Sequence, residues 1–349
     1  MNVSQRERSD YNRKTLVDMK PHRIILSIAL ALLFALPVTA AEDKKKPEKP
    51  KPAKKETSKK AATNKPTPKK TPAKKAPAKK PVAKKPAPKK PAPKPQPKSV
   101  FADKNLEKAV RRQVFAKRNT TDPLTAADVA QVAIVQGRNM GIKSLSGLEH
   151  CKSLASLDLA GNQIKDLTPI KGLPRLQQLI LHTNLVESLA PLTDNSALQY
   201  IDLNHNRLKD IKPLAGLTNL SVLYVSDNQV RNIAPITGLP KLHSFYVDRN
   251  GLASVAGLSK LRWLSSFSAS GNQIKDLKPL VGLENLSFLF LERNKISDLG
   301  PLFKMITDDY KGKQRFSPFV RIYLKNNPLS DKAKAGMKEF TKKYYTRFK

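Results

Sequence analysis

The sequence predicts an α/β solenoid, in which short repeats stack so that their strands form one parallel sheet and helices close both ends of the stack. Two observations lead to this prediction: an asparagine recurs every 22 residues, and helix-forming patterns stand before the first repeat and after the last. The asparagines that keep this spacing are Asn162, Asn184, Asn206, Asn228, Asn250, Asn272 and Asn294. A fixed period of this length is typical of architectures in which each repeat buries its apolar face against the next.

Each repeat carries apolar residues at fixed distances from its asparagine. Leucines or equivalents stand eight, five and three residues before it, as Leu154, Leu157 and Leu159 do before Asn162. The L-x-L segment predicts a short strand whose alternate side chains point inward, as in leucine-rich repeats. The asparagine amide also turns inward and needs partners, so we expect a structural ladder in which it binds backbone groups of the turn. An eighth member, Asn327, follows after 33 residues, which indicates an insertion of about 11 residues.

The ends of the stack are predicted to be helical, because a terminal repeat would otherwise expose its apolar cross-section. Residues 99–133 form the N-terminal cap, with Asp103 as the N-cap of one helix and Thr125 with Asp128 as the capping box of another. The repeats then occupy residues 134–328. Residues 329–349 are predicted as a C-terminal capping helix that begins after Ser330.

The 22-residue phrase, the cap FADKNLEKAVRR and the entry sequence MGIKSLSGLEH resemble the internalin class of bacterial leucine-rich-repeat proteins. The resemblance covers about residues 100–330. It implies a curved, right-handed solenoid that is exported by a bacterium and recognises its partner on a concave sheet. The given residues hold no immunoglobulin-like domain after the repeats and no LPxTG-type sorting signal, and a basic arm precedes the cap. The role of adhesin or invasion protein is therefore not carried over.

On such a concave face, the outward side chains are those six, four, two and one residues before each asparagine. These positions combine aromatic and charged residues, a composition that protein-binding surfaces favour. The predicted partner-binding residues are Tyr200, Asp202, His205, Tyr224, Asp227, Tyr246, Asp248, Arg249, Phe288, Phe290, Glu292, Arg293 and Tyr323. The partner is a protein or a glycan. The alternative interpretation is that the aromatic residues only pack along their own sheet.

The sequence does not predict an enzyme or a cofactor. No serine or cysteine stands beside a base in a recognisable catalytic motif, and no glycine-rich phosphate loop is present. His182 and His205 with neighbouring aspartates have the chemistry of a zinc site, but surface histidines in a repeat more often make polar contacts, so no metal is predicted. Cys151, the single cysteine, excludes a disulfide framework and is interpreted as a small buried hydrophobe.

The N-terminus predicts export. An apolar run over residues 24–41 follows Lys20 and Arg23 and ends in small residues, so residues 1–41 are interpreted as a signal peptide whose true start is Met19 or Met1. This places the protein in the periplasm, in the cell envelope or outside the cell. The alternative is an inner-membrane anchor, because about 18 apolar residues can just span a bilayer.

Residues 42–98 predict a disordered basic linker rich in Lys, Pro and Ala. From residue 44 to 98 there are 22 lysines and two glutamates, which supply +20 of the net charge of +37. The segment has no side chains that could build a core, and its prolines favour an extended chain. We expect it to bind an anionic surface or polymer of the envelope, or to act as a spacer. Nucleic acid is the weaker alternative, because the arm lacks aromatic residues that stack on bases.

Overall fold

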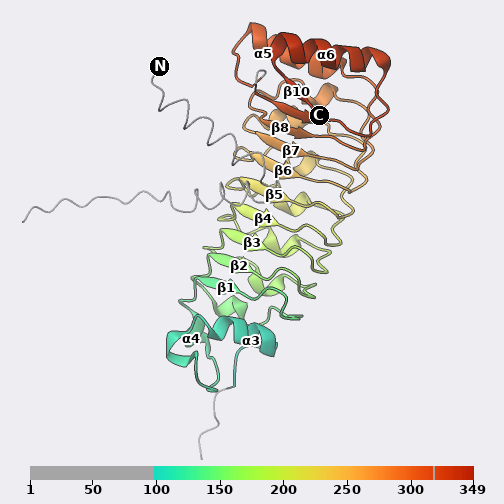
Figure 1. Cartoon of the computed structure of the whole chain (residues 1–349). Helices are drawn as coiled ribbons and strands as arrows, with labels where there is room; N and C mark the ends of the chain where they lie inside the picture. The colour runs from blue at the N-terminus through green and yellow to red at the C-terminus, as the bar shows by residue number, and fades with distance from the viewer. Residues whose placement is uncertain (1–97, 317–318) are drawn as a thin grey trace, which may run out of the picture. The chain divides into compact units, whose positions relative to one another are not determined.

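The computed structural model describes residues 98–316 and 319–349 (Figure 1). The predicted signal peptide, and the basic linker up to residue 97, lie outside the described residues. The described residues contain one sheet of ten parallel strands, arranged in chain order from β1 to β10. The predicted solenoid fold, with its helical N-terminal cap and C-terminal helix, is confirmed.

The strands are short, and each of the first seven is followed on the opposite side by a 3-10 helix, whereas the eighth is followed by a longer α-helix. The strands are β1 Ile134–Gln136, β2 Ser156–Asp158, β3 Gln178–Ile180, β4 Tyr200–Asp202, β5 Val222–Tyr224, β6 Ser244–Tyr246, β7 Ser266–Ser268, β8 Phe288–Phe290, β9 Arg321–Tyr323 and β10 Arg347–Phe348. The 3-10 helices are η1 Phe115–Lys117, η2 Leu148–His150, η3 Thr168–Ile170, η4 Ala190–Leu192, η5 Lys212–Leu214, η6 Ala234–Ile236, η7 Leu258–Lys260 and η8 Lys278–Leu280. Five of these 3-10 turns, η3 to η6 and η8, contain a proline in the first turn, where its missing N–H is not needed.

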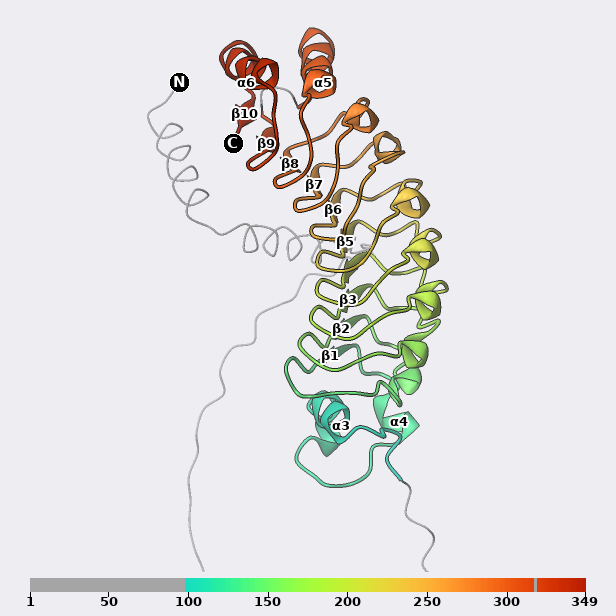
Figure 2. The ribbon, with the colours of Figure 1, turned by 90° about the vertical axis from the view of Figure 1, so that its right-hand side faces the viewer.

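The solenoid curves toward its sheet. Figure 2 shows the strands on the concave side and the 3-10 helices on the convex side. Hydrogen bonds hold neighbouring strands ~4.8 Å apart, whereas the turns opposite are bulkier and lack a continuous ladder of such bonds, so the stack bends. From β1 to β8 the register repeats every 22 residues, with Leu157 opposite Leu179 and Leu179 opposite Ile201. The residue identities of one repeat therefore lie directly beside those of the next.

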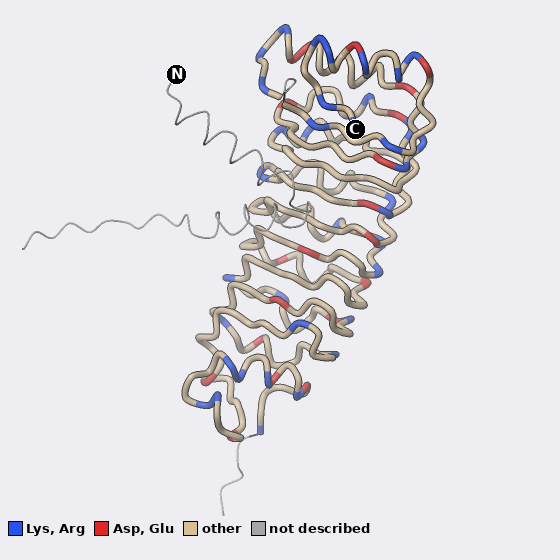
Figure 3. Tube along the Cα trace, viewed as in Figure 1, with Lys and Arg blue, Asp and Glu red and all other residues tan. Residues whose placement is uncertain are grey.

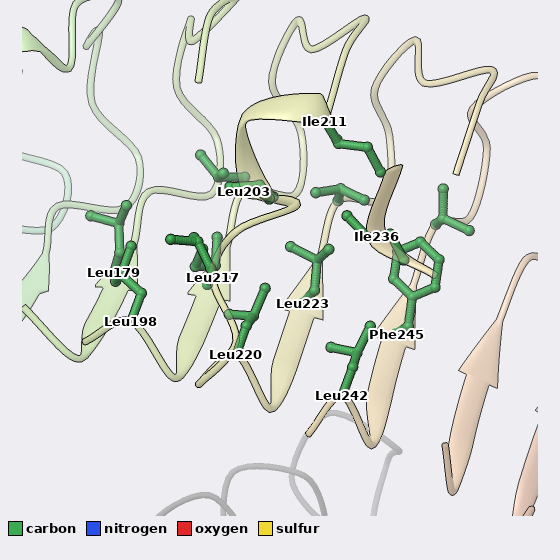
Figure 4. Close-up of a cluster of buried hydrophobic side chains, with 14 of the residues drawn as sticks. Leu179, Leu198, Leu203, Ile211, Leu217, Leu220, Leu223, Ile236, Leu242 and Phe245 are labelled. Carbon is green, nitrogen blue, oxygen red and sulfur yellow. The ribbon is translucent and has the colours of Figure 1, made fainter. Parts of the chain in front are cut away.

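One continuous apolar core runs through the solenoid from the N-terminal cap to the C-terminal helices. Figure 4 shows how leucines of successive repeats, among them Leu179, Leu203 and Leu223, meet behind the sheet. Phe245 and Phe267 occupy the strand positions equivalent to Leu179 and Leu223 in β6 and β7, and their ring centroids lie 5.7 Å apart. Cys151 is fully buried in this core, and burial raises the pKa of its thiol to about 12.

The asparagine ladder lines the edge of the core. The Nδ2 of Asn184 donates to Leu159 O and to Leu181 O, both at 3.0 Å, and its Oδ1 accepts from Ile164 N at 3.0 Å. The same pattern recurs along the stack, including at Asn327, which donates to Leu291 O across the inserted segment. Each amide therefore ties one repeat to the previous one by bonds that apolar side chains cannot make.

Helices close both ends of the stack. In the N-terminal cap, α3 (Lys104–Arg111) begins after Asp103, whose side chain accepts from two backbone amides of the first turn, and α4 (Ala126–Val129) has the predicted capping box. The insertion before Asn327 begins with α5 (Gly300–Lys311), a longer helix in place of a 3-10 turn. The helix α6 (Asp331–Tyr344) packs on α5, with the rings of Phe303 and Phe340 4.3 Å apart.

The last residues differ from the prediction of a helix over residues 329–349. The helix α6 ends at Tyr344, and residues 347–348 return to the sheet as β10, parallel to β9. The added strand covers the sheet edge that β9 would otherwise leave open, which protects it from pairing with another chain. Within the described ranges, no helix combines the length and hydropathy needed to cross a bilayer. The apolar run of residues 24–41 lies outside these ranges.

Candidate partner-binding face

The concave face presents a row of aromatic side chains that we call the aromatic ladder. Its members are Tyr200, Tyr224, Tyr246, Phe288, Phe290 and Tyr323. Four of them, with Asp202 and Ser268, occupy equivalent positions on consecutive strands from β4 to β9. The ladder is thus a consequence of the 22-residue period, which places these positions side by side.

The rings contact one another along the sheet. Tyr224 meets Tyr200 edge-on at 5.7 Å between centroids and Tyr246 at 4.9 Å. Phe290 stacks on Tyr323 at 4.6 Å and lies parallel to Phe288 at 6.1 Å. Tyr246 and Phe290 are two strands apart, but their centroids are 6.2 Å apart because the residue between them is a small serine. The rings therefore pack on their own sheet, and the surface that they leave exposed remains open to a partner.

The members of the ladder differ in exposure. Tyr224 is 6% exposed, because Tyr200 and Tyr246 cover it, whereas the other five rings are half-buried and offer part of their surface to solvent. The Tyr224 hydroxyl is buried without a hydrogen-bond partner, and burial raises its pKa above the usual range. Burial also raises the pKa of Tyr246, whose hydroxyl is 2.9 Å from Ser266 Oγ. Tyr224 is therefore a support for the ladder more than a contact residue.

Two predicted contact residues, Asp202 and Asp248, turn toward their own sheet. Asp248 accepts from the hydroxyls of Ser226 and Ser268 and from Ser270 N, so its carboxylate joins three strand ends. Asp202 accepts from Asn204 N at 3.1 Å. Burial raises the pKa of both carboxyl groups, and these hydrogen bonds to the charged form oppose the shift. These two aspartates therefore hold the strand ends in place by hydrogen bonds beneath the exposed surface of the face.

The remaining predicted residues lie along the turn edge, which we define as the two residues that directly precede each asparagine of the asparagine ladder. Asp227 binds Arg249 through both guanidinium nitrogens that face it, and His205 Nε2 lies 3.4 Å from the Asp227 carboxylate. The guanidinium lowers the pKa of Asp227. Arg293 and its neighbour Glu292 follow further along the edge, and their side chains make no hydrogen bond or ion pair within the described residues.

The turn edge has a backbone requirement that the sequence analysis missed. The residue before the asparagine has a positive φ in every repeat, at 54° for His205, 50° for Arg249 and 54° for Arg293. Glycine takes this position twice, at Gly161 and Gly271, and these glycines are the sequence signal for the left-handed turn.

Within the described residues, His182 and His205 are not part of a metal-binding cluster. Across residues 98–316 and 319–349, no group of three or more His, Cys, Asp or Glu side chains has the geometry to hold a metal ion. His182 contacts the neighbouring Thr183, with Nδ1 and Oγ1 3.3 Å apart, and His205 faces Asp227.

Comparison with known proteins agrees with this geometry. A family model for leucine-rich repeats in two copies matches residues 152–194, 196–237 and 262–304. The crystal structure of internalin C2 from Listeria monocytogenes is similar to this chain, with 30% sequence identity and a TM-score of 0.57. The alignment covers 68% of this chain and 97% of internalin C2. This chain belongs to the internalin family.

A second solved structure shows that the fold of this internalin-family chain extends to more distant proteins. A leucine-rich-repeat protein from Leptospira interrogans is 23% identical, with a TM-score of 0.50, over 58% of this chain and 56% of that one. At this identity the likeness concerns the fold alone. The aromatic ladder and the turn edge described above are features of this chain's own residues.

Proposed function

We propose that this chain is an exported, non-enzymatic binding protein whose concave face recognises a protein partner. The observation that carries the proposal is the aromatic ladder, in which five half-buried rings lie on one continuous face beside charged residues of the turn edge. Tyrosine and phenylalanine supply large contact areas at protein interfaces. Because neighbouring rings already hold each other in place, little side-chain entropy remains to be lost when a partner binds.

The predicted N-terminal segments add a location to this proposal. The signal peptide of residues 1–41 would export the chain to the periplasm, the envelope or the medium, and the lysines of residues 44–98 would hold it near an anionic surface. The two elements would act together, because the arm raises the local concentration and the concave face selects the partner.

A capture experiment tests the proposal. Immobilised full-length protein is exposed to envelope and secreted fractions of the producing bacterium at ~0.3 M salt. This salt concentration weakens attraction between exposed charges that are more than a few ångströms apart, and so suppresses binding through the lysine arm. Retained proteins are identified by mass spectrometry. We expect a specific protein to be retained by the wild type and lost by the double variant Tyr246→Ser/Phe290→Ser.

The matched control is Trp263→Ser, which removes an aromatic side chain that is 65% exposed and lies outside the ladder. This variant should retain the same protein as the wild type. Equal retention by the double variant would show that the concave face is not the binding surface. Tyr224 is left intact because its burial makes a change there a test of folding.

The second candidate function is polyanion binding by the arm, which the 22 lysines between residues 44 and 98 favour. In that case, full-length protein would bind envelope polymers only at low salt, and the Tyr246→Ser/Phe290→Ser variant would bind as well as the wild type. An inner-membrane anchor at residues 24–41 is distinguished by the N-terminus of the protein isolated from cells, because a cleaved chain begins near Ala41.

A further inference from the structure

A polar hollow of about 350 Å³ opens at the turn edge between the ends of β6 and β9. Its wall consists of Arg249, Ser270, Gly271, Glu292, Arg293, Lys325 and Asn326. Three of these had been predicted as contact residues from the sequence, and none belongs to the aromatic ladder. The hollow therefore needs an explanation of its own.

Gly271 contributes only backbone to the wall of the hollow. At the equivalent positions of the neighbouring repeats, Arg249 and Arg293 carry long side chains from the same left-handed backbone conformation. Gly271 has a φ of 69° and no side chain, and a Cβ built there would lie 2.8 Å from Arg249 Cγ. The Arg249 side chain therefore packs directly over Gly271, and the wall of the hollow has bare backbone where the neighbouring repeats carry arginine side chains.

The wall of the hollow is basic. Arg249 is paired with Asp227 on the far side, but the side chains of Arg293 and Lys325 make no hydrogen bond or ion pair within the described residues. Glu292 is the one carboxylate in the wall, so cations are in excess. Lysines and arginines also gather at the end of the solenoid formed by α5 and α6 (Figure 3), with 13 of them against four acidic residues in the last 50 residues of the chain. The potential around the hollow therefore favours an anion.

One further group in the wall lacks a partner. The Ser270 hydroxyl is buried and makes no hydrogen bond, while Ser270 N donates to Asp248 at 2.7 Å. Buried polar groups are nearly always paired, so an unpaired hydroxyl beside a hollow is a donor that a ligand oxygen can use after rotation about χ1.

We propose that this hollow is an anion subsite that receives a carboxylate side chain of the protein partner. This inference rests on the proposed function, which supplies the protein partner. Phe290 and Tyr323 of the aromatic ladder lie on β8 and β9, and the residues that follow these strands line the hollow, so one partner can contact both. The guanidinium of Arg293 and the ammonium of Lys325 bind the carboxylate oxygens, and the Ser270 hydroxyl donates to one of them. The partner thus presents an aspartate or glutamate next to an apolar patch that covers the ladder.

The first test uses a capped tetraglutamate peptide as the probe, with capped tetraglutamine as its neutral control. Isotope-labelled full-length protein is titrated at 0.15 M salt, and the NMR shifts of the Gly271 and Arg293 amides are followed, which separates the hollow from the lysine arm. We expect saturable shifts with tetraglutamate alone. The variant Arg293→Ala/Lys325→Ala should bind at least ~10-fold more weakly at these amides, the effect of losing charge-assisted hydrogen bonds.

The control variant Lys209→Ala/Arg231→Ala removes the same charge from two exposed residues elsewhere in the repeats and should bind as the wild type does. Shifts confined to the lysine arm, or equal shifts in Arg293→Ala/Lys325→Ala, would overturn the proposal.

The second test fills the hollow and needs no ligand. Gly271→Asp and Gly271→Asn add side chains of the same size, and both residue types adopt this backbone conformation at equivalent positions, at Asp227 and Asn326. If the hollow selects carboxylates, Gly271→Asp should melt about 2–4 °C higher than Gly271→Asn at low salt, and the difference should shrink at high salt. A lower melting temperature for Gly271→Asp would refute the anion subsite.

The two proposals can fail separately. Capture of a partner that Tyr246→Ser/Phe290→Ser loses, combined with negative results at the hollow, would leave the proposed function and remove the subsite. Positive results at Gly271 and Arg293 without a captured partner would leave the subsite and remove the proposed function.

Discussion

Replacing one residue of the asparagine ladder gives the sharpest test of which interactions hold neighbouring repeats together. Asn228 is 8% exposed, its Nδ2 donates to Leu203 O at 2.9 Å and to Val225 O at 3.0 Å, and its Oδ1 accepts from Leu208 N at 2.9 Å. Asn228→Ala removes all of these bonds from the middle of the stack. The substitution affects the three backbone groups differently, because the two carbonyl oxygens have a second hydrogen-bond donor and the amide has no second acceptor.

The magnitude follows from those second partners. Leu203 O also accepts from Asn206, and Val225 O from Asn250, so each carbonyl keeps one donor after the substitution. Leu208 N has no other acceptor and becomes an unpaired buried donor. An orphaned buried group costs about 1–3 kcal/mol and a lost hydrogen bond about 1 kcal/mol. We therefore expect Asn228→Ala to lower the free energy of unfolding by about 3–5 kcal/mol.

Urea unfolding followed by circular dichroism measures this loss as a shift of the midpoint at constant m. The control is Asn232→Ala in the same repeat, where an exposed amide accepts one bond from Ala234 N at 2.9 Å. This variant should lose about 0.5 kcal/mol or less. A loss below about 1 kcal/mol for Asn228→Ala, or a loss equal to that of the control, would refute the argument that the ladder satisfies groups nothing else can reach.

Three further predictions concern single residues. Gly161→Ala should destabilise the fold by about 1–3 kcal/mol, because φ is 70° and a Cβ would lie 1.9 Å from a neighbouring side-chain oxygen. The control Gly216→Ala has open space around the added Cβ and should be neutral or slightly stabilising in the same urea assay. The pKa of Asp128 is lowered to about 2, first by its hydrogen bond from Lys117, so its contribution to stability is present above pH ~4 and is lost as the pH falls toward 2. Asp128→Asn should accordingly lower the melting temperature at pH 6 and not at pH 2, and an equal loss at both would contradict the assignment. Cys151, whose buried thiol has its pKa raised to about 12, should not react with a thiol reagent at pH 8 until the protein is unfolded, and rapid reaction of the folded chain would place it at the surface.

The repeats, the caps and the direction of each strand side chain follow from the sequence by itself. The apolar residues and one asparagine recur at the same positions every 22 residues. Stacking the repeats side by side buries these apolar residues and gives each asparagine amide its backbone partners. The N-caps Asp103 and Ser330 mark helix starts for local reasons, since their side chains satisfy free amides of the first turn. The strand β10 could not be predicted in this way, because its two residues follow no repeat pattern. They pair with β9 because the end of α6 lies beside the last strand of the sheet.

Which outward residues a partner can reach was decided by the tertiary structure. Periodicity gives the direction of a side chain, but its exposure depends on the sizes of the side chains on the adjacent strands. Tyr224 is covered because large rings flank it on both sides, and Tyr246 meets Phe290 because Ser268 between them is small. The hollow at Gly271 depends on its neighbours in the same way, since its wall joins residues of adjacent repeats. The sequence lists these residues 22 positions apart, and only the stacking of the repeats turns them into neighbours.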